Sequence, residues 1–115
     1  CSNEALCALA AGVYLAALGK NLGKLASLNV CKAQYLRNGL LRLAGWEEVF
    51  SAPVYNEFTL RCPDARAVNE KLQAEGITGA YDLQKDYPEL ANTLLFCVTE
   101  MLSKNDMDRV IEIIK

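Results

Sequence analysis

The sequence is organised around residues 87–100, which read YPELANTLLFCVTE. Tyr87-Pro88 predicts a loop, because proline fixes its own φ and favours extended geometry in the residue before it. The run from Leu94 to Val98 is short, unbroken and apolar, which is typical of a strand buried on both faces. The strand then stops at the polar pair Thr99-Glu100. We expect a site or an interface at this carboxyl end.

Two helices are predicted ahead of this strand. Ser2 or Asn3 caps the first helix, and Gly19 ends it. The second helix is predicted over 22–43, because one stripe recurs at helical spacing along it. Its members are Leu22, Ala26, Asn29, Ala33, Leu36, Leu40 and Leu43. Asn29 on this stripe indicates either a hydrogen-bonded buried amide or a polar interface contact.

The rest of the chain alternates strands and helices. A short strand is predicted over 46–50, and period-two alternation predicts a half-buried strand over 54–62. A helix over 65–75 and a short extended piece over 77–83 follow, and Ser103 with Asp106 predicts a capping box at the start of a last helix. The fold class is therefore α+β: a small, mostly antiparallel sheet covered by helices. We expect a helical arm over about 1–43 and an α+β core over about 44–115.

The bulk composition is that of one ordinary globular domain. The chain has 115 residues, a net charge of −2 and 52% hydrophobic residues. Scattered Lys and Arg residues argue against binding to nucleic acid. No segment reaches the run of about eighteen apolar residues that a membrane span needs. The alanine-rich start lacks a basic region, which is unlike a signal peptide. A start at Cys1, without methionine, suggests a piece of a longer protein.

No catalytic motif is complete in the sequence. There is no histidine, so the commonest general base and metal ligand is missing. The five cysteines form no CxxC pair, and we expect buried, reduced thiols of a cytosolic protein rather than a metal site or disulfides. The lysines are expected on helix surfaces, in loops or at ends, where none is suited to forming a Schiff base. We therefore predict no catalytic, cofactor-binding or metal-binding residue in this chain.

A family resemblance extends along nearly the whole chain. The segments that carry it are Cys1-Ser2-Asn3, Ala5-Leu6, Ala8-Leu9-Ala10-Ala11, Val13-Tyr14-Leu15, Ala33-x-Tyr35-Leu36, Asn56-Glu57-Phe58, Gly76-Ile77-x-Gly79, Tyr81-x-Leu83 and Tyr87 to Glu100. In this order and spacing the sequence resembles the P-protein family of the glycine cleavage system, the glycine dehydrogenases (decarboxylating). Within that family it is similar to the end of the first subunit of the two-subunit form. Met101-Leu102 depart from the pattern, because the family usually has basic and polar residues there.

The resemblance implies a fold and an activity. The implied fold is the small C-terminal domain of a fold-type-I pyridoxal-phosphate enzyme, whose large cofactor domain lies outside these residues. The implied activity is decarboxylation of glycine on pyridoxal phosphate and transfer of the aminomethyl group to the lipoyl H-protein. The cofactor lysine would lie on subunit 2, in a cytoplasmic heterotetramer. The fragment alone would be inactive.

Six polar residues are the candidate contacts to an active-site cleft or to a subunit interface: Ser2, Asn3, Asn56, Glu57, Thr99 and Glu100. Each of them could instead be a helix cap, a strand end or an ordinary hydrogen bond. We also expect an isolated fragment to self-associate through the apolar stripe of 22–43.

Two other interpretations remain open. The chain could be the small domain of another fold-type-I enzyme, such as an aminotransferase, many of which grip a carboxylate with an arginine. Arg61 is the nearest strand candidate, but it lies on the face opposite Phe58 and Leu60, which favours solvent. The chain could also be a free-standing interaction module without a catalytic role.

Overall fold

The structure of the protein is a computed structural model, which describes residues 3–115. The sheet has the strand order β1-β2-β4-β3, and every neighbouring pair is antiparallel. The predicted α+β class is confirmed. The elements are α1 (Glu4–Leu18), α2 (Leu22–Leu40), β1 (Glu47–Glu48), β2 (Glu57–Arg61), α3 (Ala65–Ala74), β3 (Tyr81–Asp82), β4 (Thr93–Cys97) and α4 (Lys104–Ile114), with 3₁₀ turns η1 (Gly19–Asn21) and η2 (Leu83–Lys85).

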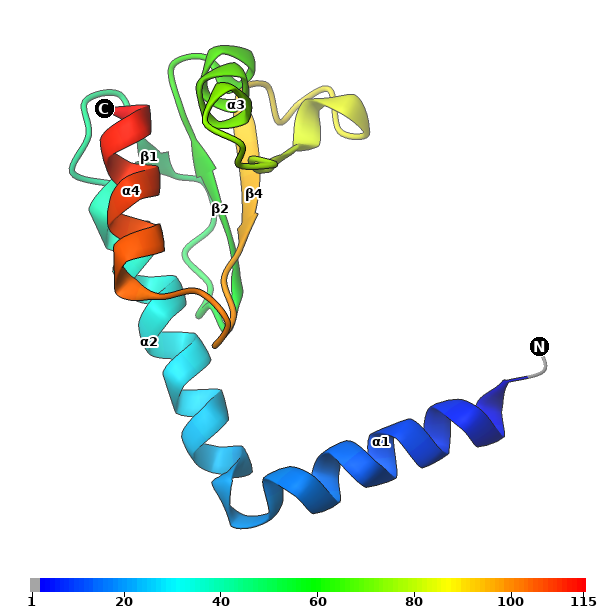
Figure 1. Cartoon of the computed structure of the whole chain (residues 1–115). Coiled ribbons are helices and arrows are strands. Elements are labelled where there is room, and N and C mark those ends of the chain that lie inside the picture. Colours follow the sequence, from blue (N-terminus) through cyan, green and yellow to red (C-terminus); the bar gives the residue numbers. More distant parts are fainter. Residues whose placement is uncertain (1–2) are drawn as a thin grey trace.

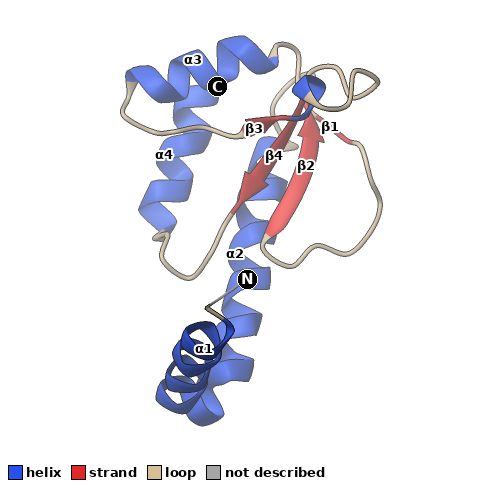
Figure 2. Ribbon diagram, turned by 90° about the vertical axis from the view of Figure 1, so that its right-hand side faces the viewer, coloured by secondary structure: helices blue, strands red, loops and turns tan. Residues whose placement is uncertain are grey.

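Helices cover one face of the sheet. Figure 1 shows α2 and α4 on one side of strands β2 and β4, to their left, while α1 extends away to the right, on the side of the opposite face; Figure 2 looks onto that open face. The register places Phe58 opposite Phe96 and Leu60 opposite Leu94, and these four side chains are buried on the covered face. The rings of Phe58 and Phe96 stack with centroids 5.4 Å apart. The core therefore lies between the sheet and its helices.

The expectation that β4 is buried on both faces is wrong. Leu94, Phe96 and Val98 are buried, but Leu95 is only partly buried and Cys97 is exposed. The continuous apolar run suggested two covered faces, whereas the described elements cover one. The strand also ends at Cys97, so Thr99 lies outside the ladder.

The second helix belongs partly to the core. Asn29, Ala33, Leu36 and Leu40 of the predicted stripe are buried, as the helical period requires, and α2 ends at Leu40 rather than at 43. The start of the helix is not covered, because Leu22 is 44% exposed. A self-associating surface along 22–43 would therefore be limited to the first half of α2, although α1 could extend it.

Helix α1 has no buried residue along its whole length. Its apolar side chains point in all directions, and Leu6 and Leu9 are each 63% exposed. The continuous helical stretch Glu4–Leu40 is long and apolar enough to span a membrane by length and composition. The expectation from the sequence concerned an unbroken run of about eighteen apolar residues. The helix passes the test of length and composition although its uncharged run, residues 5–19, has fifteen residues. A helix that is apolar all round is normally covered by protein or lipid.

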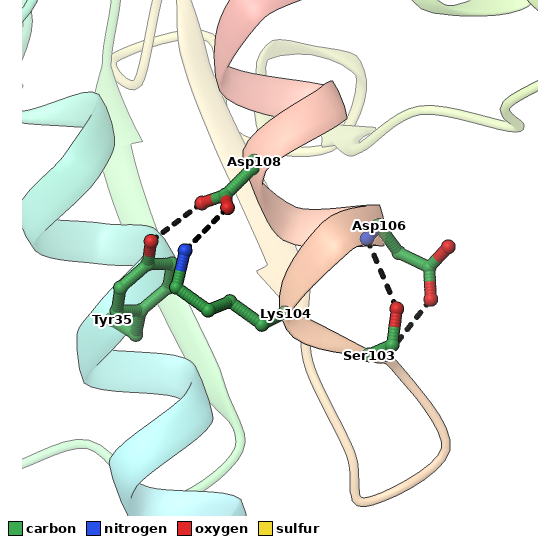
Figure 3. Close-up of polar contacts among 5 residues, drawn as sticks. All are labelled: Tyr35, Ser103, Lys104, Asp106 and Asp108. Atoms are coloured by element: carbon green, nitrogen blue, oxygen red, sulfur yellow. Dashed lines mark hydrogen bonds and ion pairs between the residues drawn. The ribbon is translucent and has the colours of Figure 1, made fainter.

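The predicted start of α4 is confirmed. Ser103 accepts a hydrogen bond from Asp106 N at 3.2 Å, and Asp106 Oδ2 accepts from Ser103 N at 2.8 Å (Figure 3). These bonds lower the pKa of the Asp106 carboxyl. Two residues further, Asp108 joins α4 to α2, because it accepts a hydrogen bond from Tyr35 Oη of α2 at 2.5 Å. It also accepts from Lys104 Nζ of its own helix, at 2.5 Å.

The expectation of buried cysteines is mostly wrong. Among the described residues only Cys62 is buried, and Cys7, Cys31 and Cys97 are exposed thiols. The error has one cause: Cys7, Cys31 and Cys97 lie on helix or sheet faces that no described element covers. Burial raises the pKa of Cys62 to about 11, so its thiol stays protonated.

Candidate functional site

Four of the six predicted contact residues lie together at one end of the sheet. Asn56 directly precedes β2 and Glu57 opens it, and the antiparallel register places Glu57 opposite Cys97 at the end of β4. Val98 N donates to Asn56 O at 2.7 Å, which extends the ladder by one more bond. Thr99 and Glu100 follow directly. We call Asn56, Glu57, Thr99 and Glu100 the sheet-end cluster.

The other two predicted residues are elsewhere. Ser2 lies outside the described residues. Asn3 stands at the start of α1, which Figure 1 shows well away from the sheet, and its side chain makes no capping hydrogen bond. The structure of this chain therefore does not bring Asn3 to the sheet-end cluster.

The turn after β4 is held by its own hydrogen bonds. Thr99 Oγ1 accepts from Met101 N at 3.4 Å, and Thr99 O accepts from Leu102 N at 3.3 Å. Thr99 and Glu100 are partly buried, whereas Glu57 is exposed. The carboxylate of Glu100 makes no hydrogen bond or ion pair with residues 3–115. It is therefore available to a group outside these residues.

Lys32 of α2 is the residue at this site that sequence reasoning missed. Its ammonium donates to Glu100 O at 2.6 Å and to Leu102 O at 2.5 Å, across about seventy residues of chain. The sequence predicts the lysines of this helix on its surface. The only signal in the sequence is its spacing, because it lies three residues after Asn29 and four before Leu36, at the edge of the buried stripe.

Asn29 stands one turn before Lys32 and is incompletely bonded. Its Nδ2 donates to Tyr55 Oη at 3.4 Å, and its Oδ1 is buried without a partner among the described residues. The amide is thus neither fully satisfied nor at an exposed interface. Tyr55, which is 49% exposed, connects it to the strand end that carries Asn56.

The cluster has the chemistry of a contact surface. Partial burial and the nearby Glu57 carboxylate raise the pKa of the Cys97 thiol, which disfavours the nucleophilic thiolate. Asn56 Nδ2 approaches Cys97 Sγ only at 3.9 Å. Within residues 3–115 no three Cys, Asp or Glu side chains converge to hold a metal ion. Amides, carboxylates and a hydroxyl of this kind orient a neighbour rather than attack it.

The described lysines do not fit a Schiff-base site. Lys32 is held by two carbonyls, Lys71 donates to Ile114 O at 3.3 Å, and Lys104 pairs with Asp108. The hydrogen bond to Asp108 raises the pKa of Lys104, which is opposite to what a Schiff base requires. We therefore derive no catalytic step through pyridoxal phosphate from this chain.

Comparison with known proteins gives consistent matches. The model of the family described as glycine cleavage system P-protein matches residues 1–114. The chain is 46% identical, over 117 aligned residues, to a probable glycine dehydrogenase (decarboxylating) subunit 1 of Desulfotalea psychrophila. It is 44% identical to the protein of the same description from Anoxybacillus flavithermus. These alignments cover 100% and 97% of this chain, but 26% and 25% of the relatives.

Solved structures agree on the fold. A crystal structure of inhibitor-bound glycine decarboxylase (P-protein) superposes with a TM-score of 0.75 and 32% identity, over 89% of this chain and 23% of that one. A C-DES mutant with glycine covalently linked to its pyridoxal-phosphate cofactor superposes with a TM-score of 0.64, over 78% of this chain and 23% of that one. At 13% identity, the second match supports the fold alone: the small α+β domain of fold-type-I pyridoxal-phosphate enzymes.

The chain spans about a quarter of the length of the curated relatives it matches. The family model nevertheless matches all but the last of its residues. With the identity to subunit 1 proteins and the superposition on a P-protein, this shows that the chain belongs to the glycine cleavage system P-protein family.

Proposed function

We propose that this chain is the C-terminal small domain of subunit 1 of a glycine dehydrogenase (decarboxylating). The complete enzyme would decarboxylate glycine on pyridoxal phosphate and pass the aminomethyl group to the lipoyl H-protein. The observation that carries the proposal is the 46% identity to a subunit 1 protein along the whole chain. The described lysines are committed elsewhere or exposed, so the cofactor lysine would lie outside this domain. We place it on subunit 2, as the family resemblance implies. We place the heterotetramer in the cytoplasm.

The role proposed for this domain is to hold the assembly together and to complete the wall of the active-site cleft. The chain exposes 7642 Å², whereas a compact monomer of 12.6 kDa exposes about 6,200 Å². Its radius of gyration is 16.4 Å, against about 13 Å for a compact domain of this length. The excess of roughly 1,400 Å² is more than the about 800 Å² that one side of a standard interface buries. A large protein surface would cover α1 and the open sheet face.

Protein is a better cover for α1 than lipid. The fifteen residues from Ala5 to Gly19 carry no charge, and Lys20 follows them directly. At 1.5 Å per residue this stretch is about 22 Å long, which is short of the about 30 Å of a bilayer core. We therefore propose no membrane partner. We propose no nucleic acid partner either, because the Lys and Arg residues are scattered along the chain.

The alternatives are less well supported. An aminotransferase-like enzyme would be consistent with the C-DES superposition, but that match has 13% identity, against 32% for the P-protein structure. Arg61 is partly buried at the far end of β2 from the sheet-end cluster, opposite Thr93 in the register. A free-standing module would leave the exposed apolar surface of α1 without a partner.

The test uses full-length subunit 1 carrying this sequence, combined with subunit 2, pyridoxal phosphate and lipoylated H-protein. Release of CO₂ from carboxyl-labelled glycine is the measurement. We expect activity from the wild-type complex and a loss in Glu100→Ala, with Glu112→Ala as the control, because Glu112 is an exposed carboxylate of α4 outside the cluster. An inactive wild-type complex would refute the assignment. Unchanged activity and assembly in Glu100→Ala would remove Glu100 from the cleft.

A further inference from the structure

The bonding of Lys32 is unusual for a lysine on a helix. Its side chain is partly buried, and two of its three donors reach backbone carbonyls, Glu100 O at 2.6 Å and Leu102 O at 2.5 Å. It forms no ion pair with a carboxylate among residues 3–115. A partly buried ammonium that contacts no carboxylate directly has a desolvation cost. These two charge-assisted bonds are what offset that cost.

The two bonds fix the turn to α2. Met101 lies between the two carbonyls and is 82% exposed, so packing of Met101 does not hold the turn in place. The other bonds of the turn, from Leu102 N and Met101 N to Thr99, are internal to it. They define its shape and not its place on the domain. The bond from Val98 N to Asn56 O anchors the start of the turn, and Lys32, with the partly buried Leu102 side chain, holds the rest of it against α2.

The position of the turn decides where Glu100 projects. Lys32 binds the backbone carbonyl of Glu100, while the Glu100 carboxylate stays free of the described residues. The same turn follows directly on Val98, which is bonded to Asn56. Removing the Lys32 ammonium would release Glu100 from the sheet-end cluster without changing any residue of that cluster.

We infer that Lys32 is a positioning residue for the cleft, acting through Glu100 by holding the carbonyls of Glu100 and Leu102. This inference rests on the proposed function, in which Glu100 contributes to the cleft wall. Lys32 itself touches no substrate in this account. Its contribution to the reaction should vanish when the Glu100 carboxylate is absent, which a merely structural lysine would not show.

A double-mutant cycle in the full-length complex tests this dependence. Lys32→Met should lower kcat/KM about fivefold or more in the wild-type background, and less than about twofold in Glu100→Ala. Lys71→Met is the matched control, because Lys71 also donates to a backbone carbonyl. Its acceptor is Ile114 O of α4, outside the sheet-end cluster. Multiplicative effects of Lys32→Met and Glu100→Ala would overturn the inference. So would an inactive Lys32→Met in the Glu100→Ala background.

Hydrogen exchange provides a readout that does not depend on activity. In the full-length subunit, amides of residues 98–104 should exchange about tenfold faster in Lys32→Met than in wild type or Lys71→Met. Lys32→Arg, which keeps a long cationic donor, should give intermediate exchange. Equal exchange in Lys32→Met and Lys71→Met would overturn the inference even if the complex is active. An inactive wild-type complex with normal exchange would count against the proposed function and not against the hold of Lys32 on the turn.

Discussion

Gly79 and Gly76 form a natural pair for separating backbone strain from steric clash. Both have positive φ, +91° and +75°. A Cβ on Gly79 would lie 2.4 Å from Asn69 Oδ1, whereas one on Gly76 would meet nothing within 4 Å. Gly79→Ala therefore combines strain with a clash, and Gly76→Ala adds strain alone.

The expected stability losses follow from the two hydrogen bonds that the Asn69 side chain makes with the Ala80 backbone. Its Oδ1 accepts from Ala80 N and its Nδ2 donates to Ala80 O, both at 2.9 Å. Strain at positive φ costs about 1–2 kcal/mol for alanine. Loss of two hydrogen bonds adds about 1–3 kcal/mol. We expect a loss of unfolding free energy of about 1–2 kcal/mol for Gly76→Ala and about 2–5 kcal/mol for Gly79→Ala.

Urea unfolding followed by tryptophan fluorescence measures the difference. Trp46 is the single tryptophan, it is 8% exposed, and its ring lies 6.1 Å from that of Phe96, so its signal reports the core. Two protein concentrations control for self-association. Equal losses for Gly76→Ala and Gly79→Ala would refute the clash argument. A Gly79→Ala cost that stays the same in an Asn69→Ala background would refute it as well.

Three further predictions concern the cap, the core and the thiols. Ser103→Ala should destabilise the domain by about 1 kcal/mol at pH 7. Ser103 lowers the pKa of Asp106 in the folded state. The part of the stability loss that depends on ionised Asp106 is therefore present above about pH 4 and disappears as the pH falls through the folded pKa. Equal losses in urea titrations at pH 7 and at pH 3 would contradict this. Leu94→Ala, at a fully buried site, should cost about 2–5 kcal/mol in the same assay, and a loss below about 1 kcal/mol would show that the site collapses. In thiol labelling with mass spectrometry, Cys31 should react in the folded state and Cys62 only on unfolding, since Cys62 is buried with a raised pKa; equal rates would contradict this.

Local patterns predicted most of the elements. The order of helices and strands, the capping box at Ser103 and the stripe from Asn29 to Leu40 all follow from periodicity and capping chemistry, which depend on neighbours along the chain. Boundaries differed by a few residues, as at the end of α2. Sequence reasoning selected Asn56 and Glu100 among six candidate contacts to a cleft or an interface, and the pairing of β2 with β4 brings these two to the same end of the sheet.

Contacts between distant segments could not be predicted in this way. The hydrogen bond from Lys32 Nζ to Leu102 O joins residues seventy positions apart. The sequence around Lys32 gives no sign that this lysine binds carbonyl groups rather than water. The same applies to Asn92, which adopts a positive φ of 54° and accepts a hydrogen bond from Ala65 N at 3.3 Å.

The sequence by itself determined the family, the α+β class and the period of each buried stripe, because these depend on residue identity and spacing. Only the tertiary structure decided which faces are covered. The run from Leu94 to Val98 looked like a strand buried on both sides, yet Cys97 is exposed, and α1 has no buried residue. An apolar side chain in the sequence indicates a surface that is stable when buried, but it does not indicate whether its own domain or another protein buries it. For Cys97 and α1, the described part of the chain does not provide this burial.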